Sequence, residues 1–332
     1  NTLKEAEMSH HQKQIDEVVK AVKAADVESI YLVGCGGSMA ALAPMEYFFD
    51  TECNVPVKVY SSNEFVYRKP TRLNKNSLVI TRSHSGTTPE TIEATKMATE
   101  AGALTVAISM EEESDLCKAA KYIIHYDYSK EKKIDLFEGD TTVGLRLMAS
   151  ILNAIEPNEK YERLLDQLKG IESLVEKNRE AYKEKAEEFG KTLKRDKIIY
   201  TMASGQYYPE MYAWTSCLMM EMQWVHSHHI HSGEYFHGPF EITDYDVPFL
   251  IVRSNGKTKH LDDRAISFVK KYSDMVYIID TNDFIYDGID EELQEFVGGI
   301  IAGKIARDYA ERLADHRGHP LSVRRYMWRM EY

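Results

Sequence analysis

Short apolar runs alternate with longer mixed stretches through the first half of the chain. Each run is rich in β-branched residues and has the length of a buried strand, and each stretch between runs is long enough for a helix and a loop. Apolar strands joined by helices predict a parallel sheet with helices on both faces, in which ligands bind at the carboxyl ends of the strands. The runs occupy residues 30–33, 57–60, 78–81, 104–108 and 122–125.

The pattern changes between residues 156 and 194, where Glu, Lys, Leu and Ala recur with helical spacing. This segment predicts long helices that link two halves of the chain. Because residues 31–38 and 200–205 both read as a strand that runs into a small-residue turn, we interpret the two halves as a degenerate duplication. Strand-like runs resume at 198–202, 247–252 and 275–280, and a C-terminal helix is expected near 290–314.

These patterns predict an organisation in five parts. An N-terminal helix precedes a first α/β domain that carries phosphate-binding loops, and a helical linker leads to a second α/β domain with the catalytic groups. An irregular tail then closes the active site. The predicted ranges are 1–24, 25–155, 156–194, 195–315 and 316–332.

Composition and charge narrow the class of protein. The chain has 332 residues, 43% hydrophobic and 28% charged, which is enough for two domains with separate cores. Its net charge of −12 argues against nucleic acid as a partner, because phosphate backbones attract clustered Lys and Arg. No apolar run is long enough to span a bilayer and no signal peptide is visible, so no membrane partner is expected. The four cysteines are scattered without metal-ligand spacing, which favours a cytoplasmic location: Cys35, Cys53, Cys117 and Cys217.

A hydroxyl-rich segment, residues 83–91, lies between a predicted strand and a predicted helix. Pro89 suits the first helical turn, and Gly86 allows a tight turn that points backbone amides at a ligand. The positive end of the helix dipole favours an anion there, so the segment is a candidate phosphate site. The alternative is an ordinary helix cap rich in Ser and Thr.

Residues 34–38 form a second candidate loop, in which Gly36 and Gly37 would let a ligand approach the backbone and Ser38 would add a hydroxyl. The loop lacks the full dinucleotide-binding glycine pattern and the lysine of a nucleotide-binding P-loop, so neither a dinucleotide nor ATP is supported.

Glu221 and His237 lie sixteen residues apart, on either side of the junction between an apolar helix and a glycine-containing loop. An acid among Leu, Met and Trp would be partly removed from water, which suits a general base. The alternative for Glu221 is a solvent-facing helix residue, and His237 alone could be structural. Five histidines fall in the range His226 to His237, so a metal site is considered. Their spacing does not reproduce the zincin arrangement of two histidines and a glutamate, and clustered histidines can also line a polar pocket or an interface without a metal.

Together these motifs resemble the double SIS-domain sugar isomerase family over nearly the whole chain, with residues 25–150 similar to a first SIS domain and 195–320 to a second. Their order is similar to that of the isomerase half of glucosamine-6-phosphate synthase, and the resemblance implies a flavodoxin-like α/β fold in each domain. That synthase has a tail lysine that binds the sugar covalently, whereas no lysine follows Lys304 here. Residues 221–241 and the tail from His319 more closely resemble the fructosamine-6-phosphate deglycases. The motifs are residues 34–38, 62–65, 83–88, Glu221 and 233–239.

The resemblance also implies roles for individual residues. Glu221 would be the base that moves a proton between C1 and C2 of the sugar, and His237 would assist from a neighbouring subunit. The family is at least dimeric, with shared active sites, and needs no metal or organic cofactor. Phosphate would be bound by Ser38, Ser83, His84, Ser85 and Thr88, and other parts of the substrate by Gly36, Gly37, Glu64, His319 and Arg324.

The activity implied is cleavage of a 6-phosphorylated Amadori compound, of the fructoselysine 6-phosphate type, to glucose 6-phosphate and a free amino acid. A C1–C2 proton shuttle followed by imine hydrolysis would accomplish it. An aldose–ketose isomerase or a glucosamine-6-phosphate deaminase would use the same shuttle, and a non-catalytic sugar-phosphate sensor would keep the fold. The presence of both Glu221 and His237 argues for catalysis.

Overall fold

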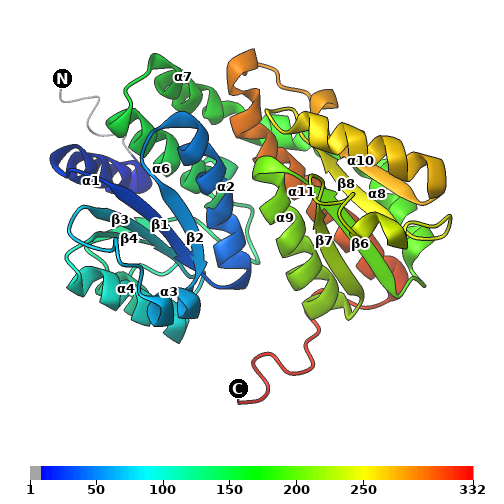
Figure 1. Ribbon diagram of the computed structural model, residues 1–332, viewed down its shortest axis with the longest axis horizontal. Coiled ribbons are helices and arrows are strands. Elements are labelled where there is room, and N and C mark those ends of the chain that lie inside the picture. The colour runs from blue at the N-terminus through cyan, green and yellow to red at the C-terminus, as the bar shows by residue number, and fades with distance from the viewer. Residues whose placement is uncertain (1–8, 332) are drawn as a thin grey trace. The chain divides into compact units, whose positions relative to one another are not determined.

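The computed structural model describes residues 9–331, and the chain divides into two compact units between Glu172 and Ser173. The boundary lies at the start of helix α8 (Ile171–Leu193). Each unit contains one parallel sheet and its helices (Figure 1). Among the described residues, no helix is both long and apolar enough to cross a membrane.

The sheet of the first unit contains five parallel strands in the order β2-β1-β3-β4-β5. Every residue of the two central strands, β1 and β3, is buried, as expected for a sheet with helices on both faces. Each predicted strand agrees with an observed one to within one residue at either end. The strands are β1 (Ser29–Gly34), β2 (Val57–Ser61), β3 (Ser77–Arg82), β4 (Leu104–Ser109) and β5 (Tyr122–His125).

Two groups of helices cover this sheet. One group, α1 (His10–Ala24), α2 (Gly36–Glu52) and α6 (Asp140–Ile155), packs together on one face. The other group, α3 (Ser62–Arg68), α4 (Pro89–Glu100) and α5 (Asp115–Ala119), packs on the opposite face. There the alternate β1 residues Tyr31 and Val33 meet Phe65 of α3 and two small residues of α4, Ala94 and Ala98, in one apolar cluster. The short helices η2 (Leu136–Glu138) and η3 (Leu168–Gly170) and helix α7 (Glu159–Gln167) complete the unit.

The second unit has four parallel strands in the order β7-β6-β8-β9. Helix α10 (Lys259–Tyr272) packs on one face, where its apolar residues meet alternate residues of the strands. Aromatic side chains from three other helices, Phe189, Trp214 and Tyr309, pack against one another elsewhere in the unit. The strands are β6 (Ile198–Ala203), β7 (His226–His231), β8 (Phe249–Arg253) and β9 (Val276–Asp280). The remaining elements are η4 (Gly205–Tyr207), α9 (Tyr208–Ala213), the π-helix η5 (Trp214–Gln223), η6 (Pro239–Ile242), η7 (Thr281–Asp283), η8 (Glu291–Leu293) and α11 (Gln294–Arg317).

The predicted α/β class with two parallel sheets is confirmed. The first sheet has the flavodoxin-like strand order 2-1-3-4-5, and the second sheet has four strands in the order 2-1-3-4. Strand β7 was not predicted. It consists mainly of histidines, which give neither an apolar run nor an alternation. The expected division of the chain into five parts is finer than the two observed units and stays a prediction.

Candidate functional site

Three loops of the first unit lie side by side at the carboxyl edge of its sheet. The register pairs Gly34, the last residue of β1, with Ser61 at the end of β2 and with Arg82 at the end of β3. The chain leaves β1 toward one neighbour and returns on the other side, which is the topological switch point where open α/β sheets bind ligands. The sequence motifs at 34–38, 62–65 and 83–88 therefore meet at one place.

The loop after β1 leaves its backbone accessible. Gly36 has a φ of +52°, which favours glycine, and a Cβ added to it would meet no atom within 4 Å. Gly36 and Gly37 are exposed, and Ser38 is half-buried in the first turn of α2. Among the described residues, no side chain caps this helix. Because the positive end of the helix dipole adjoins an open glycine turn, the loop is suited to an anion.

The loop after β3 holds its hydroxyls in two pairs. Ser83 Oγ lies 2.8 Å from Thr88 Oγ1, and Ser85 Oγ lies 2.7 Å from Thr87 Oγ1. Gly86 turns between the two pairs with a φ of +68° and donates its amide to Ser83 Oγ. Thr88 is the N-cap residue of α4 without a capping side-chain hydrogen bond, so its hydroxyl can turn to a ligand. The loop offers uncharged donors arranged before any ligand arrives.

His84 is supported from behind by a chain of hydrogen bonds. Its Nδ1 lies 2.7 Å from the hydroxyl of Tyr126, and that hydroxyl is 3.4 Å from a guanidinium nitrogen of the buried Arg82. Arg82 also forms an ion pair with Asp140. Burial, together with the nearby charge of Asp140, raises the pKa of Tyr126 to about 12, so the phenol keeps its proton.

This chain determines which nitrogen of His84 carries a proton. Burial is the main cause that lowers the pKa of His84 below its usual value, so its imidazole is neutral at pH 7. Arg82 can only donate, so the proton of Tyr126 is directed to His84 Nδ1. The neutral ring then carries its own proton on Nε2 and can donate it to a phosphate oxygen. Sequence analysis missed Arg82, Tyr126 and Asp140, although an Arg that ends an apolar strand-like run, directly before the hydroxyl-rich segment, was a usable signal.

Glu64 reaches the same edge of the sheet from α3. It is exposed, and its carboxylate lies 3.5 Å from the exposed guanidinium of Arg68 one turn later. An exposed pair of this kind contributes little to stability and leaves the carboxylate mobile. The buried hydroxyls of Ser62 and Thr91, 2.9 Å apart, join α3 to α4. The substrate-binding role expected for Glu64 stays a prediction.

Glu221 of the second unit lies on the π-helix η5, where an α-helix had been expected. π-Helical segments are rare and occur frequently at functional sites. The carboxylate Oε1 lies 2.9 Å from Nε of Arg324, and the two side chains are only 19% and 10% exposed. Arg324 also donates to the backbone carbonyls of Leu321 and Val323. A residue of the C-terminal tail thus holds the carboxylate in one place.

Further contacts attach the tail to the end of this π-helix. Gln223 donates its side-chain amide to the carbonyl of His319 at 2.6 Å, and the rings of Trp224 and His319 are 4.6 Å apart. Arg325 lies over the ring of Trp224, 4.2 Å from its centre. Trp224 itself adopts a left-handed conformation, with φ +56°, which ends the helix. The predicted residues His319 and Arg324 therefore both contact the segment that carries Glu221.

His237 lies in the turns that precede η6, and its side chain is exposed. Within residues 9–331, no hydrogen bond or ion pair joins its imidazole to Glu221 or to another side chain. The next residue, Gly238, has a φ of +126°. The histidines of β7 are spread along an edge strand, and in the described part of the chain they join no group of three potential metal ligands. The role expected for His237 stays a prediction.

The fold is that of an α/β protein with open loops at the carboxyl edge of a parallel sheet, and the SIS domain family profile matches residues 23–152. Over 323 residues the chain is 38% identical to fructosamine deglycase FrlB of Bacillus subtilis (strain 168), which covers 96% of this chain and 97% of that protein. It is 30% identical over 282 residues to fructoselysine 6-phosphate deglycase of Escherichia coli (strain K12), covering 84% and 82% of the two chains. A phosphosugar isomerase homologue of known structure from Bacillus subtilis superposes with a TM-score of 0.93 at 38% identity, covering 96% and 97%. The chain therefore belongs to the fructosamine deglycase family of SIS-domain proteins.

Proposed function

We propose that this protein is a deglycase that cleaves a 6-phosphorylated fructosamine to glucose 6-phosphate and a free amine. The observation that carries the proposal is the partly buried Glu221 carboxylate, paired with Arg324, in a chain similar over nearly its full length to a fructosamine deglycase. The relative from Escherichia coli, a fructoselysine 6-phosphate deglycase, favours fructoselysine 6-phosphate as the first substrate to test.

The reaction moves two protons and adds one water. In the open-chain substrate, C1 carries the amine and C2 is the carbonyl carbon. Glu221 removes a proton from C1 while O2 gains one, which gives an enaminol. Glu221 then returns its proton to C2 while the amine nitrogen loses one, which gives an imine between C1 and that nitrogen. Water adds to the imine carbon, the C1–N bond breaks, and the aldehyde of glucose 6-phosphate and the amine are released. Proton transfer by one positioned group contributes about 10²- to 10⁴-fold to such rates.

Arg324 orients the Glu221 carboxylate for this proton transfer. Its Nε forms an ion pair at 2.9 Å with one carboxylate oxygen of Glu221, and its Nη1 donates to two tail carbonyls. A carboxylate held by one partner retains its second oxygen for the substrate proton. Because kcat depends on reacting atoms being held in one geometry, the pair favours rapid transfer.

The loops of the first unit bind the phosphate. Amides of the glycine turn, the hydroxyls of Ser38, Ser83, Ser85 and Thr88, and Nε2–H of His84 are the donors. These donors act locally, which matters because the chain as a whole has a charge of −12 and repels anions. Binding energy from the phosphate would orient the distant C1 and C2 atoms for proton transfer.

The family resemblance adds two further proposals. His237 acts at the sugar oxygens of a neighbouring subunit, so the active protein is at least a dimer; its exposure and lack of partners within residues 9–331 support this role. Separately, no disulfide joins the four cysteines within residues 9–331, which suits a reducing compartment such as the cytoplasm.

The test is release of glucose 6-phosphate from fructoselysine 6-phosphate, followed with a coupled dehydrogenase, by the wild type and by Glu221→Gln. Glu184→Gln, at an exposed acid of helix α8 outside the motifs, is the matched control. We expect release by the wild type and by Glu184→Gln but not by Glu221→Gln. α- and ε-linked amines and other amino acids are compared in the same assay. If no phosphorylated fructosamine is cleaved, the deglycase proposal is wrong; if Glu221→Gln remains fully active, the base is another residue.

A further inference from the structure

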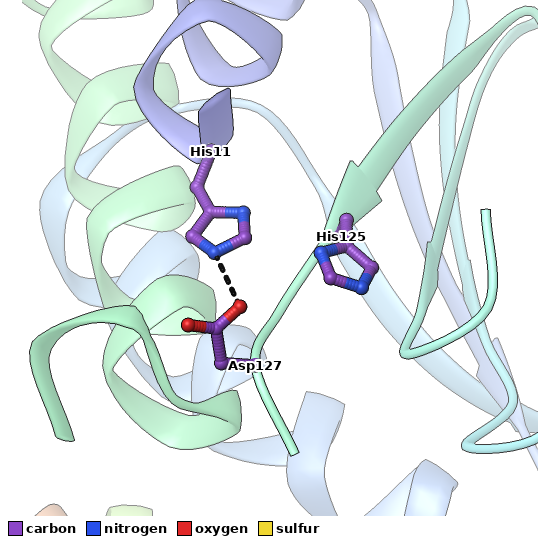
Figure 2. A group of neighbouring side chains, drawn as sticks. All are labelled: His11, His125 and Asp127. Atoms are coloured by element: carbon purple, nitrogen blue, oxygen red, sulfur yellow. Dashed lines mark hydrogen bonds and ion pairs between the residues drawn. The ribbon is translucent and has the colours of Figure 1, made fainter. Parts of the chain in front are cut away.

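A second group of chemistry-bearing side chains lies in the first unit, apart from the residues assigned above. His11 comes from the first turn of α1, His125 ends β5, and Asp127 follows two residues later. Figure 2 shows the three side chains converging. One potential ligand atom from each lies within 4.8 Å of the other two.

The hydrogen bonds of His125 leave one of its nitrogens ready to bind a cation. Its Nε2 lies 2.9 Å from the carbonyl of Met110, which can only accept, so Nε2 carries the proton. Nδ1 faces away from this carbonyl contact and is buried without a hydrogen-bond partner. A backbone carbonyl that fixes the far nitrogen in this way is the usual support of a metal-binding histidine.

His11, like His125, has a buried ring nitrogen without a hydrogen-bond partner. The residue is only 5% exposed, its Nε2 lies 3.0 Å from Asp127 Oδ1, and its Nδ1 is buried without a partner. A buried polar nitrogen without a partner is costly, and a bound ion is one of its ordinary explanations. Asp127 is 45% exposed at its side chain, which leaves a route for an ion from solvent.

The surrounding charge also favours a divalent cation. Glu138 is paired with the buried Arg146 at 2.9 Å, whereas Asp127 faces His11. Glu112 lies 3.7 Å from His125 Nδ1 and also contacts His10 Nε2 at 2.6 Å. Two carboxylates thus lie next to the two imidazoles. Imidazole nitrogen combined with carboxylate oxygen suits Zn²⁺, whereas Mg²⁺ and Ca²⁺ prefer oxygen ligands alone.

We propose that His11, His125 and Asp127 bind a Zn²⁺ ion, with Glu112 beside the site. The ion would join the first turn of α1 to the end of β5. His125 and Asp127 flank Tyr126, whose hydroxyl supports His84, so the ion would also fix that support. It has no part in the proton transfer proposed above.

The test is Zn²⁺ binding to chelator-treated protein, measured by equilibrium dialysis with elemental analysis and by calorimetry. We expect about one Zn²⁺ per chain, with affinity reduced by about tenfold or more in His125→Asn and in Asp127→Asn. His228→Asn, at an exposed histidine of β7, is the control and should bind as the wild type does. Melting temperature is recorded for each protein with and without Zn²⁺, so that a folding defect is separated from a binding defect. We expect Zn²⁺ to raise it in the wild type and in His228→Asn only.

Three results would overturn the proposal: no stoichiometric binding by the wild type, undiminished binding by both site variants, or loss of binding in His228→Asn. The first result would mean that protons alone balance the charges around His11 and His125. Each readout is independent of deglycase activity, so the proposal stands or falls separately from the proposed function.

Discussion

The two units repeat one strand order, but the loops at the carboxyl ends of their sheets differ in charge. In the first unit the turn after β3 holds Gly86 among hydroxyls, with no carboxylate among the partners that fix it. In the second unit the turn after β8 is occupied by acids. A Cβ on Gly256 would lie 1.7 Å from a carboxylate oxygen of Glu295, and the amide of Ser254 donates to Asp262 at 2.8 Å.

This difference fits a division of the two proposed roles, with phosphate binding in the first unit and proton transfer in the second. A phosphate at the second turn would meet two carboxylates, whereas the first turn offers neutral donors and a helix N-terminus. The second unit instead carries Glu221, the proposed base, on a π-helix beside the tail. After a duplication, the anion site can be kept in one copy and closed in the other by side chains alone, with the sheet unchanged.

The largest loss of activity is expected from a substitution of Glu221, the proposed base in the second unit. Glu221→Gln keeps the shape of the side chain but cannot accept the proton, so kcat should fall by about 10³-fold. Phosphate-sugar binding, measured by calorimetry with glucose 6-phosphate, should be unchanged. A large loss of binding in this variant would show that the second unit also holds the phosphate, and the division of tasks would fail.

Alanine substitutions of Gly86, after β3, and Gly256, after β8, compare the effects of the two turns on KM. Gly86→Ala places a Cβ 2.1 Å from Ser114 Oγ at a φ that favours glycine, so the loop must shift. Loss of one or more charge-assisted hydrogen bonds of about 1.5–3 kcal/mol should raise KM roughly 10- to 100-fold with little change in kcat. Gly256→Ala meets the flexible end of Glu295 and should leave KM unaltered, whatever it does to stability. Equal KM increases in the two variants would contradict the comparison.

A smaller effect is expected from the partner of the base. Arg324→Gln removes the ion pair with Glu221, and we expect kcat to fall about tenfold, equivalent to about 1.4 kcal/mol in the barrier, with KM nearly constant. Arg325→Gln is the control, because Arg325 lies over Trp224 instead. Steady-state kinetics on the two variants distinguishes them. Similar losses would mean that the tail as a whole, and not the ion pair, supports catalysis.

The smallest effect concerns the pH dependence of stability. The pKa of His84 is lowered in the folded protein, chiefly by burial, so the unfolded chain binds a proton there more readily. His84 should therefore cost no stability above its ordinary pKa near 6.5, and should reduce stability as pH falls through and below that value. Denaturant unfolding of the wild type and His84→Gln between about pH 5 and 8 measures this. The variant should show the shallower loss toward acid; parallel curves would mean that His84 titrates normally.

The sequence predicted the strands and loops of the first unit better than those of the second. The strands of the first sheet are runs of valine, isoleucine and leucine, and the loops after them carry recognisable glycines and hydroxyls, so both strands and loops were predicted. In the second unit, β7 is a row of histidines without strand patterning, and it was missed. The periodicity of an apolar segment also does not distinguish the wider π-helical turn of η5 from an α-helix.

Side-chain contacts between residues far apart in the sequence could not be predicted either. Arg324 forms an ion pair with Glu221, and the tail sequence alone does not specify which carboxylate it reaches. The substrate contact expected for Arg324 stays a prediction. Tyr126 and Asp140 support His84 only because β5 and α6 bring them behind the loop. Such contacts depend on how the chain packs, whereas loop motifs depend on a few adjacent residues.

The position of Arg324, after the last helix of the second unit, has a consequence for the order of events during synthesis. Domains generally fold as units as the chain emerges, the N-terminal one first. All strands of the first sheet precede residue 126, so its ligand loops can form long before the tail leaves the ribosome. Glu221 gains its arginine only when almost the whole described chain has been made. An unfinished chain would therefore be able to hold a sugar phosphate without being equipped to break it down.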